Sequence, residues 1–153
     1  MNVSYITVIQ LLQRVHRLYL AAIKWDLEQL GIQDINNSQC VILLNIGDYE
    51  LTVGELTSRG IYLGSNVAYN VRQMAEAGYL THERSQYDRR VSYVRATEKG
   101  RKLRDELINA HRRRVELLSE IAPTSDELRA ATAALRLLDS FWTSLVYRVQ
   151  SSP

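Results

Sequence analysis

The sequence predicts a mainly helical α+β fold, in which several helices surround one small β-hairpin. Three observations lead to this prediction. Both ends of the chain have apolar residues at helical spacing, the middle has two short helical segments between capping residues and glycines, and two alternating runs follow at residues 79–86 and 91–96. At 153 residues the chain fits one domain with helical extensions.

The first predicted helix covers residues 3–30 and carries apolar residues on two faces. One face contains Ile6, Ile9 and Ile23, and the other contains Val8, Val15 and Leu18. A helix that is apolar on two faces must bury both of them. Because a chain of this length cannot easily surround such a helix, we expect a second subunit to cover it, which makes the protein a homodimer.

Two helices are predicted at the C-terminal end. The first covers residues 97–121 and is broken at Ala122-Pro123, because the residue before a proline disfavours the helical conformation. The second begins with a capping box of Thr124 and Glu127 and continues to Gln150. Its apolar stripe consists of Leu128, Ala131, Leu135, Leu138, Trp142, Leu145 and Val149. This stripe is a second candidate for the dimer interface.

The centre contains three shorter helices and the hairpin. A helix at residues 37–46 follows an Asn-Asn-Ser cap cluster and ends at Gly47. A capping box of Thr52 and Glu55 begins the next helix, and a further helix at residues 65–77 stops at Gly78. Helix, turn, helix and hairpin in this order describe a winged helix-turn-helix. We therefore expect dimerisation at residues 1–36, a DNA-binding core at 37–100, and dimerisation again at 101–153.

Positive charge is concentrated in the middle of the chain. Residues 59–114 contain thirteen Lys and Arg against six Asp and Glu, whereas the whole chain has a net charge of only +2. A basic centre between acidic ends favours a polyanionic partner, and double-stranded DNA fits the predicted fold. The alternative is a solvated basic helix face at residues 101–114.

The helix at residues 65–77 is the candidate for insertion into the major groove, since the second helix of a helix-turn-helix takes that position. Val67, Val71, Met74 and Ala75 share one face and should pack inward. The opposite face carries Ser65, Asn66, Ala68, Tyr69, Arg72 and Gln73. These residue types contact phosphates and base edges, and the open N–H groups at the start of the helix suit a phosphate. The alternative is a face of ordinary exposed polar residues.

The tip of the hairpin is short and polar, with Arg89 and Arg90 adjacent. An arginine at such a tip can enter the minor groove, where the negative potential is enhanced. Asp88 would repel DNA unless it has a local task, and we expect it to hold Arg90 by a charge-assisted hydrogen bond. Arg84, with Arg59, Arg95, Lys99 and Arg101, is a candidate for backbone contacts. The alternative is a plain surface turn with a surface ion pair.

From Leu51 to Gly100 the chain resembles the MarR family of bacterial regulators. The resemblance rests on four motifs, which are Leu51-Thr52-Val53-Gly54-Glu55-Leu56, Met74-Ala75-Glu76-Ala77-Gly78-Tyr79-Leu80, Asp88-x-Arg90 and Ala96-Thr97-Glu98-Lys99-Gly100. The terminal helices match the family in layout. The stretch at residues 62–70 is similar to an alphaproteobacterial subgroup that includes LdtR.

The resemblance implies an obligate homodimer that binds a pseudo-palindromic operator, with recognition helices in successive major grooves and wings in flanking minor grooves. It makes Arg90 the minor-groove arginine and Asp88 its orienting partner. It also implies repression, and release of DNA when a small aromatic ligand binds between the dimer region and the winged core. Ala68-Tyr69 departs from the more usual Thr-Arg of the family, so the resemblance does not define the base contacts at these two positions.

Candidates for an effector pocket come from the first two helices. They are His16, Tyr19, Trp25, Cys40 and Leu44, and the alternative for each is ordinary packing. Cys40, the only cysteine, lies among apolar residues without nearby positive charge, which disfavours a redox role. The three histidines are far apart in sequence, so we expect no metal site, and no cofactor is expected.

Other classes of function find little support in the sequence. The chain has no glycine-rich phosphate loop, nucleophile elbow or paired carboxylates, so an enzyme is not expected. It has no apolar run long enough for a membrane span and no secretory signal, which predicts a cytoplasmic protein without a membrane partner. The main alternative is a winged-helix module that binds protein and not DNA.

Overall fold

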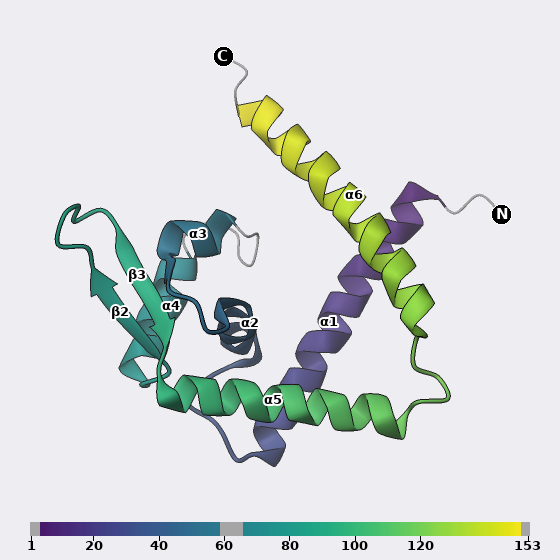
Figure 1. The fold of residues 1–153 in the computed structure, drawn as a ribbon, viewed down its shortest axis with the longest axis horizontal. Coiled ribbons are helices and arrows are strands. Elements are labelled where there is room, and N and C mark those ends of the chain that lie inside the picture. Colours follow the sequence, from purple (N-terminus) through teal and green to yellow (C-terminus); the bar gives the residue numbers. More distant parts are fainter. Residues whose placement is uncertain (1–3, 59–65, 151–153) are drawn as a thin grey trace. The chain divides into compact units, whose positions relative to one another are not determined.

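The computed structural model describes residues 4–58 and 66–150. Its elements are α1 (Tyr5–Gln29), α2 (Asn37–Ile46), β1 (Leu51–Thr52), α3 (Val53–Ser58), α4 (Asn66–Glu76), β2 (Leu80–Arg84), β3 (Ser92–Ala96), α5 (Glu98–Leu117) and α6 (Ser125–Gln150) (Figure 1). The helices and the hairpin lie where the sequence predicts them. The chain forms two compact units, Met1–Arg112 and Arg113–Pro153, and α5 crosses from the first into the second.

The sheet has three antiparallel strands, in the order β1-β3-β2. The predicted hairpin of β2 and β3 is therefore confirmed, and β1 is a further strand that was not predicted. Leu51 and Thr52 pair with Val94 and Tyr93 and add a third strand. A strand of two residues shows no alternation in the sequence, so only the tertiary pairing reveals it.

The core of the first unit is built from α1, α2, α4, the sheet and the first half of α5. Ile42, Leu43 and Ile46 of α2 are almost fully buried, as are Val71 of α4 and Val94 of β3. The C-terminal part of α1 contributes Ile23 and Leu27, and α5 contributes Leu103 and Leu107. On α4 the buried residues belong to the inward face that the sequence predicts, whereas on α1 only the C-terminal end of the predicted apolar face is buried.

The predicted caps are confirmed. Thr52 and Glu55 exchange hydrogen bonds of 2.7 and 3.0 Å at the start of α3. Thr124 and Glu127 form the same arrangement before α6. The Asn36 side chain accepts from the backbone N–H of Gln39 before α2. Gly78 has a φ of 82° after α4, a conformation that glycine adopts without steric cost.

The start of α5 packs directly on the chain that leaves α4. The Thr97 N–H donates to Tyr79 O at 3.0 Å, and its hydroxyl donates to Gly78 O at 2.6 Å. A Cβ on Gly100 would collide with the Tyr79 carbonyl oxygen. Only glycine therefore lets α5 approach the end of α4 this closely, which explains the glycine that closes the Ala96–Gly100 motif.

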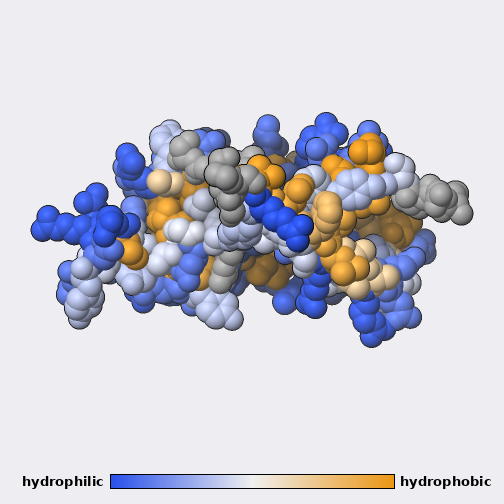
Figure 2. Space-filling view, turned by 90° about the horizontal axis from the view of Figure 1, so that it is seen from above, coloured by the Kyte–Doolittle hydropathy of each residue, from blue (hydrophilic) through white to orange (hydrophobic). Residues whose placement is uncertain are grey.

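The N-terminal two-thirds of α1 and most of α6 expose apolar side chains. On α1, Ile6, Val15 and Leu18 are each about 60% exposed. On α6, Leu137, Phe141 and Val149 are more than half exposed, and none of the residues described on α6 is buried. Figure 2 shows that hydrophobic residues are present on the surface, whereas the wing tip is mostly hydrophilic. Each helix thus has an apolar face that its own unit leaves open.

Candidate nucleic-acid interface

Helix α4 has two opposite faces of different character. Val67, Val71 and Met74 are at most 1% exposed and fix the helix to the core, as predicted. Ala75 is half-buried at the edge of that face. The other face is exposed and carries Asn66, Ala68, Tyr69, Arg72 and Gln73. The core therefore holds the helix by one face and leaves the predicted DNA-reading face open to solvent.

Some predicted contact residues lie outside the described part of the chain. They are Ser65 and Arg59. The proposed phosphate contact at the start of α4 stays a prediction for that reason. Arg84, at the end of β2, is exposed.

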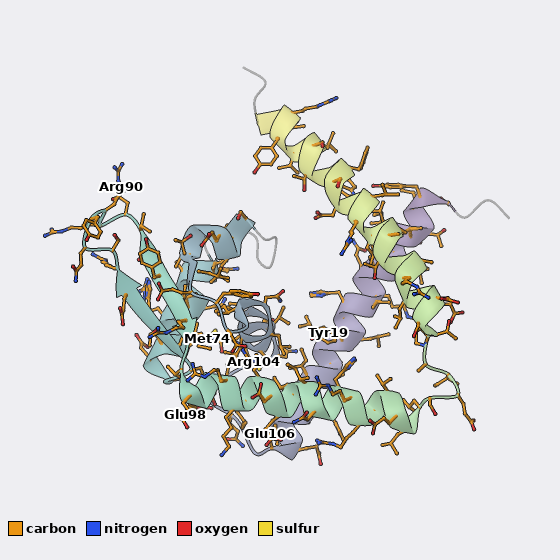
Figure 3. All side chains as sticks on the ribbon, in the orientation of Figure 1. Tyr19, Met74, Arg90, Glu98, Arg104 and Glu106 are labelled. Carbon is orange, nitrogen blue, oxygen red and sulfur yellow. The ribbon has the colours of Figure 1, made fainter. Side chains whose placement is uncertain are left out.

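The wing tip is a defined turn between β2 and β3. The Ser85 N–H donates to Val91 O, and the Ser85 hydroxyl oxygen accepts from the backbone N–H groups of Tyr87 and Asp88. Arg89 and Arg90 are both exposed, and the side chain of Arg90 projects from the tip away from the sheet (Figure 3). The turn thus presents two cations at the end of the hairpin.

Asp88 holds Arg90 as predicted. Its Oδ1 atom accepts from the backbone N–H of Arg90 at 2.9 Å and from Nε of the same residue at 3.3 Å. The Arg90 side chain is nevertheless 92% exposed. Because only Nε faces Asp88, the outer guanidinium nitrogens are directed to solvent and can donate to another acceptor. Tyr87 beside them is fully exposed and was not among the predicted contacts.

Gln39 and Asn70, which were not among the predicted site residues, connect α2 to the exposed face of α4. Gln39 is 4% exposed, and its Nε2 donates to Asn70 Oδ1 and Gln73 Oε1, both at 3.1 Å. Gln73 in turn donates to the Tyr69 hydroxyl at 2.7 Å. The capping box of Asn36 and Gln39 is visible in the sequence, but the reach of Gln39 to α4 is a tertiary contact.

The five effector-pocket candidates occupy different environments. His16 is exposed, Tyr19 and Trp25 are 41% and 54% exposed, Leu44 is half-buried, and Cys40 is completely buried. Burial raises the pKa of the Cys40 thiol to about 12, so the thiol stays protonated near neutral pH. Burial also raises the pKa of Tyr19, and the nearby Cys40 adds to that shift.

A cavity of about 600 Å³ lies elsewhere in the first unit, between the α1–α2 connection and the first half of α5. Its apolar lining includes Leu30, Ile32 and Leu103, and none of the five effector candidates lines it. The candidates therefore stay predictions, and the cavity is an additional location for a ligand.

A group of three polar side chains forms one wall of this cavity. Asp34 accepts from the Tyr79 hydroxyl at 2.6 Å and from Lys99 Nζ at 2.8 Å. These hydrogen bonds, with that from Lys99 the stronger, lower the pKa of Asp34. Lys99 Nζ also donates to Ala77 O at 2.7 Å and lies 4.1 Å from the centroid of the Tyr79 ring. Lys99 thus connects the cavity wall to the C-terminal end of α4.

Other kinds of site are not evident in the part of the chain that the structure describes. No three His, Cys, Asp or Glu side chains there are grouped closely enough to hold a metal ion. Among the helices described, none combines the length and apolar character needed to cross a bilayer.

Comparison with known proteins agrees with this geometry. A family model described as a winged helix DNA-binding domain matches residues 35–100. The chain is 35% identical over 140 residues to the exopolysaccharide II synthesis transcriptional activator ExpG of Rhizobium meliloti (strain 1021), and the match covers 92% of this chain and 72% of ExpG.

Solved structures share the fold. AbsC, a MarR family transcriptional regulator from Streptomyces coelicolor, has a TM-score of 0.71 at 17% identity, with 94% of this chain and 99% of AbsC covered. The chain belongs to the MarR family of winged-helix transcriptional regulators. FabT of Streptococcus pneumoniae in complex with DNA has a TM-score of 0.68 at 21% identity, with 93% of this chain and 99% of FabT covered.

Membership of the MarR family confirms the predicted fold and the resemblance stated from the motifs. It also agrees with the prediction that the chain is not an enzyme, because the relatives are transcriptional regulators. The similarity to the LdtR subgroup stays a prediction. The structure does not describe residues 62–65, which form part of the stretch on which that similarity rests.

Proposed function

We propose that this MarR-family protein is a homodimer that binds a pseudo-palindromic operator. Helix α4 of each subunit enters a major groove, and each wing places Arg90 in the flanking minor groove. The observation that carries the proposal is the division of α4, in which one face is locked into the core and the other presents polar residues beside an arginine-tipped wing.

The dimer follows from the apolar faces of α1 and α6. Large contiguous apolar surfaces are rare on monomeric proteins and mark sites of association. Nine large apolar residues of α6 are exposed, among them Leu135, Trp142 and Leu145 of the predicted stripe. A second copy of this chain is the partner that fits. A pseudo-palindromic operator requires two DNA-binding cores related by a twofold axis.

The wing supports a minor-groove contact. Its arginines are exposed, and Asp88 restricts the conformations of Arg90 without covering its outer nitrogens. A pre-oriented side chain loses less conformational entropy on binding. The narrow minor groove of A·T-rich DNA attracts arginine because its negative potential is enhanced.

The proposed binding is tested by fluorescence anisotropy with DNA fragments from the promoter of its own gene and from neighbouring promoters. We expect binding that prefers one fragment over random DNA and that weakens steeply as salt increases from 50 to 200 mM, since phosphate contacts release counterions. A folded protein with no preference for any fragment would instead favour the protein-interaction module considered as the alternative.

We further propose that a small, mainly apolar ligand regulates DNA binding from the cavity beside α5. Lys99 supports this role, because it contacts both the cavity wall and the carbonyl oxygen of Ala77 just after α4. Phenols and aromatic carboxylates should raise the melting temperature and weaken operator binding. The Ile32→Trp variant, which narrows the cavity, should abolish both effects, and retention of both would place the ligand elsewhere.

The direction of regulation is a separate part of the proposal. The family resemblance favours repression, whereas ExpG is named as an activator. We propose repression. A reporter gene under the promoter fragment that the protein prefers in the anisotropy experiment tests this proposal. Deleting the regulator should raise expression of the reporter, and a fall in expression would show an activator.

A further inference from the structure

A continuous chain of side-chain hydrogen bonds runs from the buried start of α2 to the exposed face of α4. It passes from Gln39 to Gln73 and from Gln73 to Tyr69, with a branch from Gln39 to Asn70. The chain begins at a residue that is 4% exposed and ends at a hydroxyl on a residue that is 56% exposed. It therefore connects the protein interior with the predicted base-reading surface.

Gln39 can take only one orientation. Its Oε1 accepts from the backbone N–H of Asn36 at 3.1 Å, as part of the capping box. A backbone N–H only donates, so the atom that faces it must be the amide oxygen. The Nε2 group must then face α4, where its two hydrogens have two acceptors, Asn70 Oδ1 and Gln73 Oε1.

The Asn70 amide is oriented independently, and its orientation agrees with that of Gln39. Its Nδ2 donates to the backbone carbonyl of Asn66 at 2.8 Å. A carbonyl oxygen only accepts, so Nδ2 must face it and Oδ1 must face Gln39. Two backbone groups at opposite ends of the network, a donor at Asn36 and an acceptor at Asn66, thus require one consistent assignment of both amides.

The same donor-to-acceptor order continues from Gln39 through Gln73 to Tyr69 at the surface. Because Gln73 Oε1 accepts from Gln39, its Nε2 is the group that faces the Tyr69 hydroxyl and donates to it at 2.7 Å. The Tyr69 oxygen is therefore an acceptor inside the protein, and its hydroxyl hydrogen is left to donate outward. The second hydrogen of Gln73 Nε2 is also a donor, and the Arg72 guanidinium next to them only donates.

We propose that Gln39, a residue that does not reach the DNA, is a positioning residue that sets the hydrogen-bond polarity of the recognition helix and thereby its base preference. The proposal rests on the proposed function, because it needs α4 to lie in the major groove. It assigns to the pair Tyr69 and Gln73 the recognition of a base edge that offers acceptors only.

The expected base is guanine. Guanine presents two acceptors in the major groove, N7 and O6, whereas adenine presents one acceptor and one donor. A free glutamine pairs with adenine through both its amide groups. Gln73 does not present this pair of groups to a base, because its oxygen faces Gln39 and its Nε2 faces Tyr69. We therefore expect one operator position in each half-site to prefer guanine over adenine by about tenfold.

The first test measures base preference with a randomised operator library for the full-length wild type and two surface variants. Tyr69→Phe removes the outward donor and should reduce the guanine preference at one position about threefold, while preferences elsewhere stay the same. Gln73→Glu keeps the acceptor for Gln39 but turns the Tyr69 hydroxyl hydrogen inward. It should shift that same position toward adenine or cytosine, which offer an amino donor.

The second test reverses the direction of the hydrogen bonds by changing Gln39, the residue at which the chain begins. In Gln39→Glu the carboxylate still accepts from Asn36 but no longer donates, so the Gln73 amide turns over and Tyr69 presents acceptor lone pairs outward. The guanine position should change to adenine or cytosine. Asn45→Asp is the matched control, since it introduces the same charge on an exposed position of α2 and should leave the base preference unchanged.

The outcomes distinguish failure of the proposed role of Gln39 from failure of the proposed function, operator binding. If the wild type binds no sequence selectively, the proposed function fails. If the wild type binds selectively but neither Tyr69→Phe nor Gln73→Glu changes the base preference at any operator position, the proposed role of the hydrogen-bond chain is wrong. Because both of these residues are exposed, the result holds even if Gln39→Glu does not fold, which circular dichroism and thermal melting check.

Discussion

The winged core and helix α6 use the same kind of apolar periodicity for different purposes. In the core, Ile42 and Leu43 of α2, Val71 and Met74 of α4, and Val94 of β3 are each at most 1% exposed. On α6 a comparable stripe is present, yet every large apolar residue of that stripe except Leu138 is more than a third exposed. The core pattern is buried within the first unit, whereas the described residues of the second unit leave the α6 pattern exposed.

Hydrophobic periodicity therefore predicts that a face will be buried, but not which molecule buries it. Apolar surface contributes to stability only when it is removed from water. For the core this occurs on folding, and for α6 we propose that it occurs on association with a second copy of the chain. The boundaries predicted at residues 36/37 and 100/101 reflect this functional division and stay predictions.

The largest expected effect breaks the association itself. The double variant Leu135→Asp/Leu145→Asp places two charges on the apolar stripe of α6. Sedimentation should show a monomer at micromolar concentration. Operator affinity should fall at least about 100-fold, because the DNA-binding cores of the two subunits are no longer connected.

The control for this prediction is Ser140→Asp, which adds a charge on the opposite face of α6. It should leave both the dimer and the operator affinity unchanged. If the double variant sediments as the wild type does, the stripe is not the interface.

The second prediction separates DNA binding from association. Arg90→Ala removes the exposed guanidinium at the wing tip but touches no apolar face. Operator affinity measured by anisotropy should fall about ten- to hundredfold, and the logarithmic salt dependence should become shallower by about one unit. Lys24→Ala, an exposed cation on α1, is the control and should change neither quantity. An unchanged dissociation constant for Arg90→Ala would refute the wing contact.

The third prediction contrasts an ion pair of the core with one of α6. The Arg104 side chain is 11% exposed and donates to Asp48 at 2.8 Å and to Asp105 at 3.2 Å. Chemical denaturation of Arg104→Ala should show a loss of about 2 kcal/mol in the free energy of unfolding, since packing and charge-assisted hydrogen bonds are both lost.

The matched variant is Arg129→Ala, which removes the exposed pair between Arg129 and Asp126 on α6. It should cost less than about 0.5 kcal/mol, because water screens an exposed pair. Equal losses in the two variants would show that burial does not distinguish these pairs.

The smallest expected effect concerns Cys40 at the centre of the core. Because burial raises its pKa from the ordinary 9.0 to about 12, the native thiol should not react with a disulfide reagent at pH 8, whereas the unfolded chain should react at once. Its contribution to stability is complete below pH 9 and should decrease as the pH rises from 9 to 12. Rapid labelling of the native protein would show that the core opens.

Local signals determined much of this protein. Capping residues at Asn36, Thr52 and Thr124 and the glycine at position 78 set the helix boundaries, because each acts on backbone groups a few residues away. The pairing of Asp88 with Arg90 was also predictable, since both residues belong to one turn. The exposed face of α4 followed from its period of 3.6 residues.

Contacts between distant segments were decided only by the tertiary structure. The third strand depends on Leu51 meeting Val94, and the cavity depends on the α1–α2 connection lying against α5. The connection from Gln39 to Tyr69 spans 30 positions of sequence and exists because α2 packs beside α4. Hydrogen bonds act over about 3 Å, and a sequence read by its local periodicity carries no record of which distant groups the folded chain brings within that range.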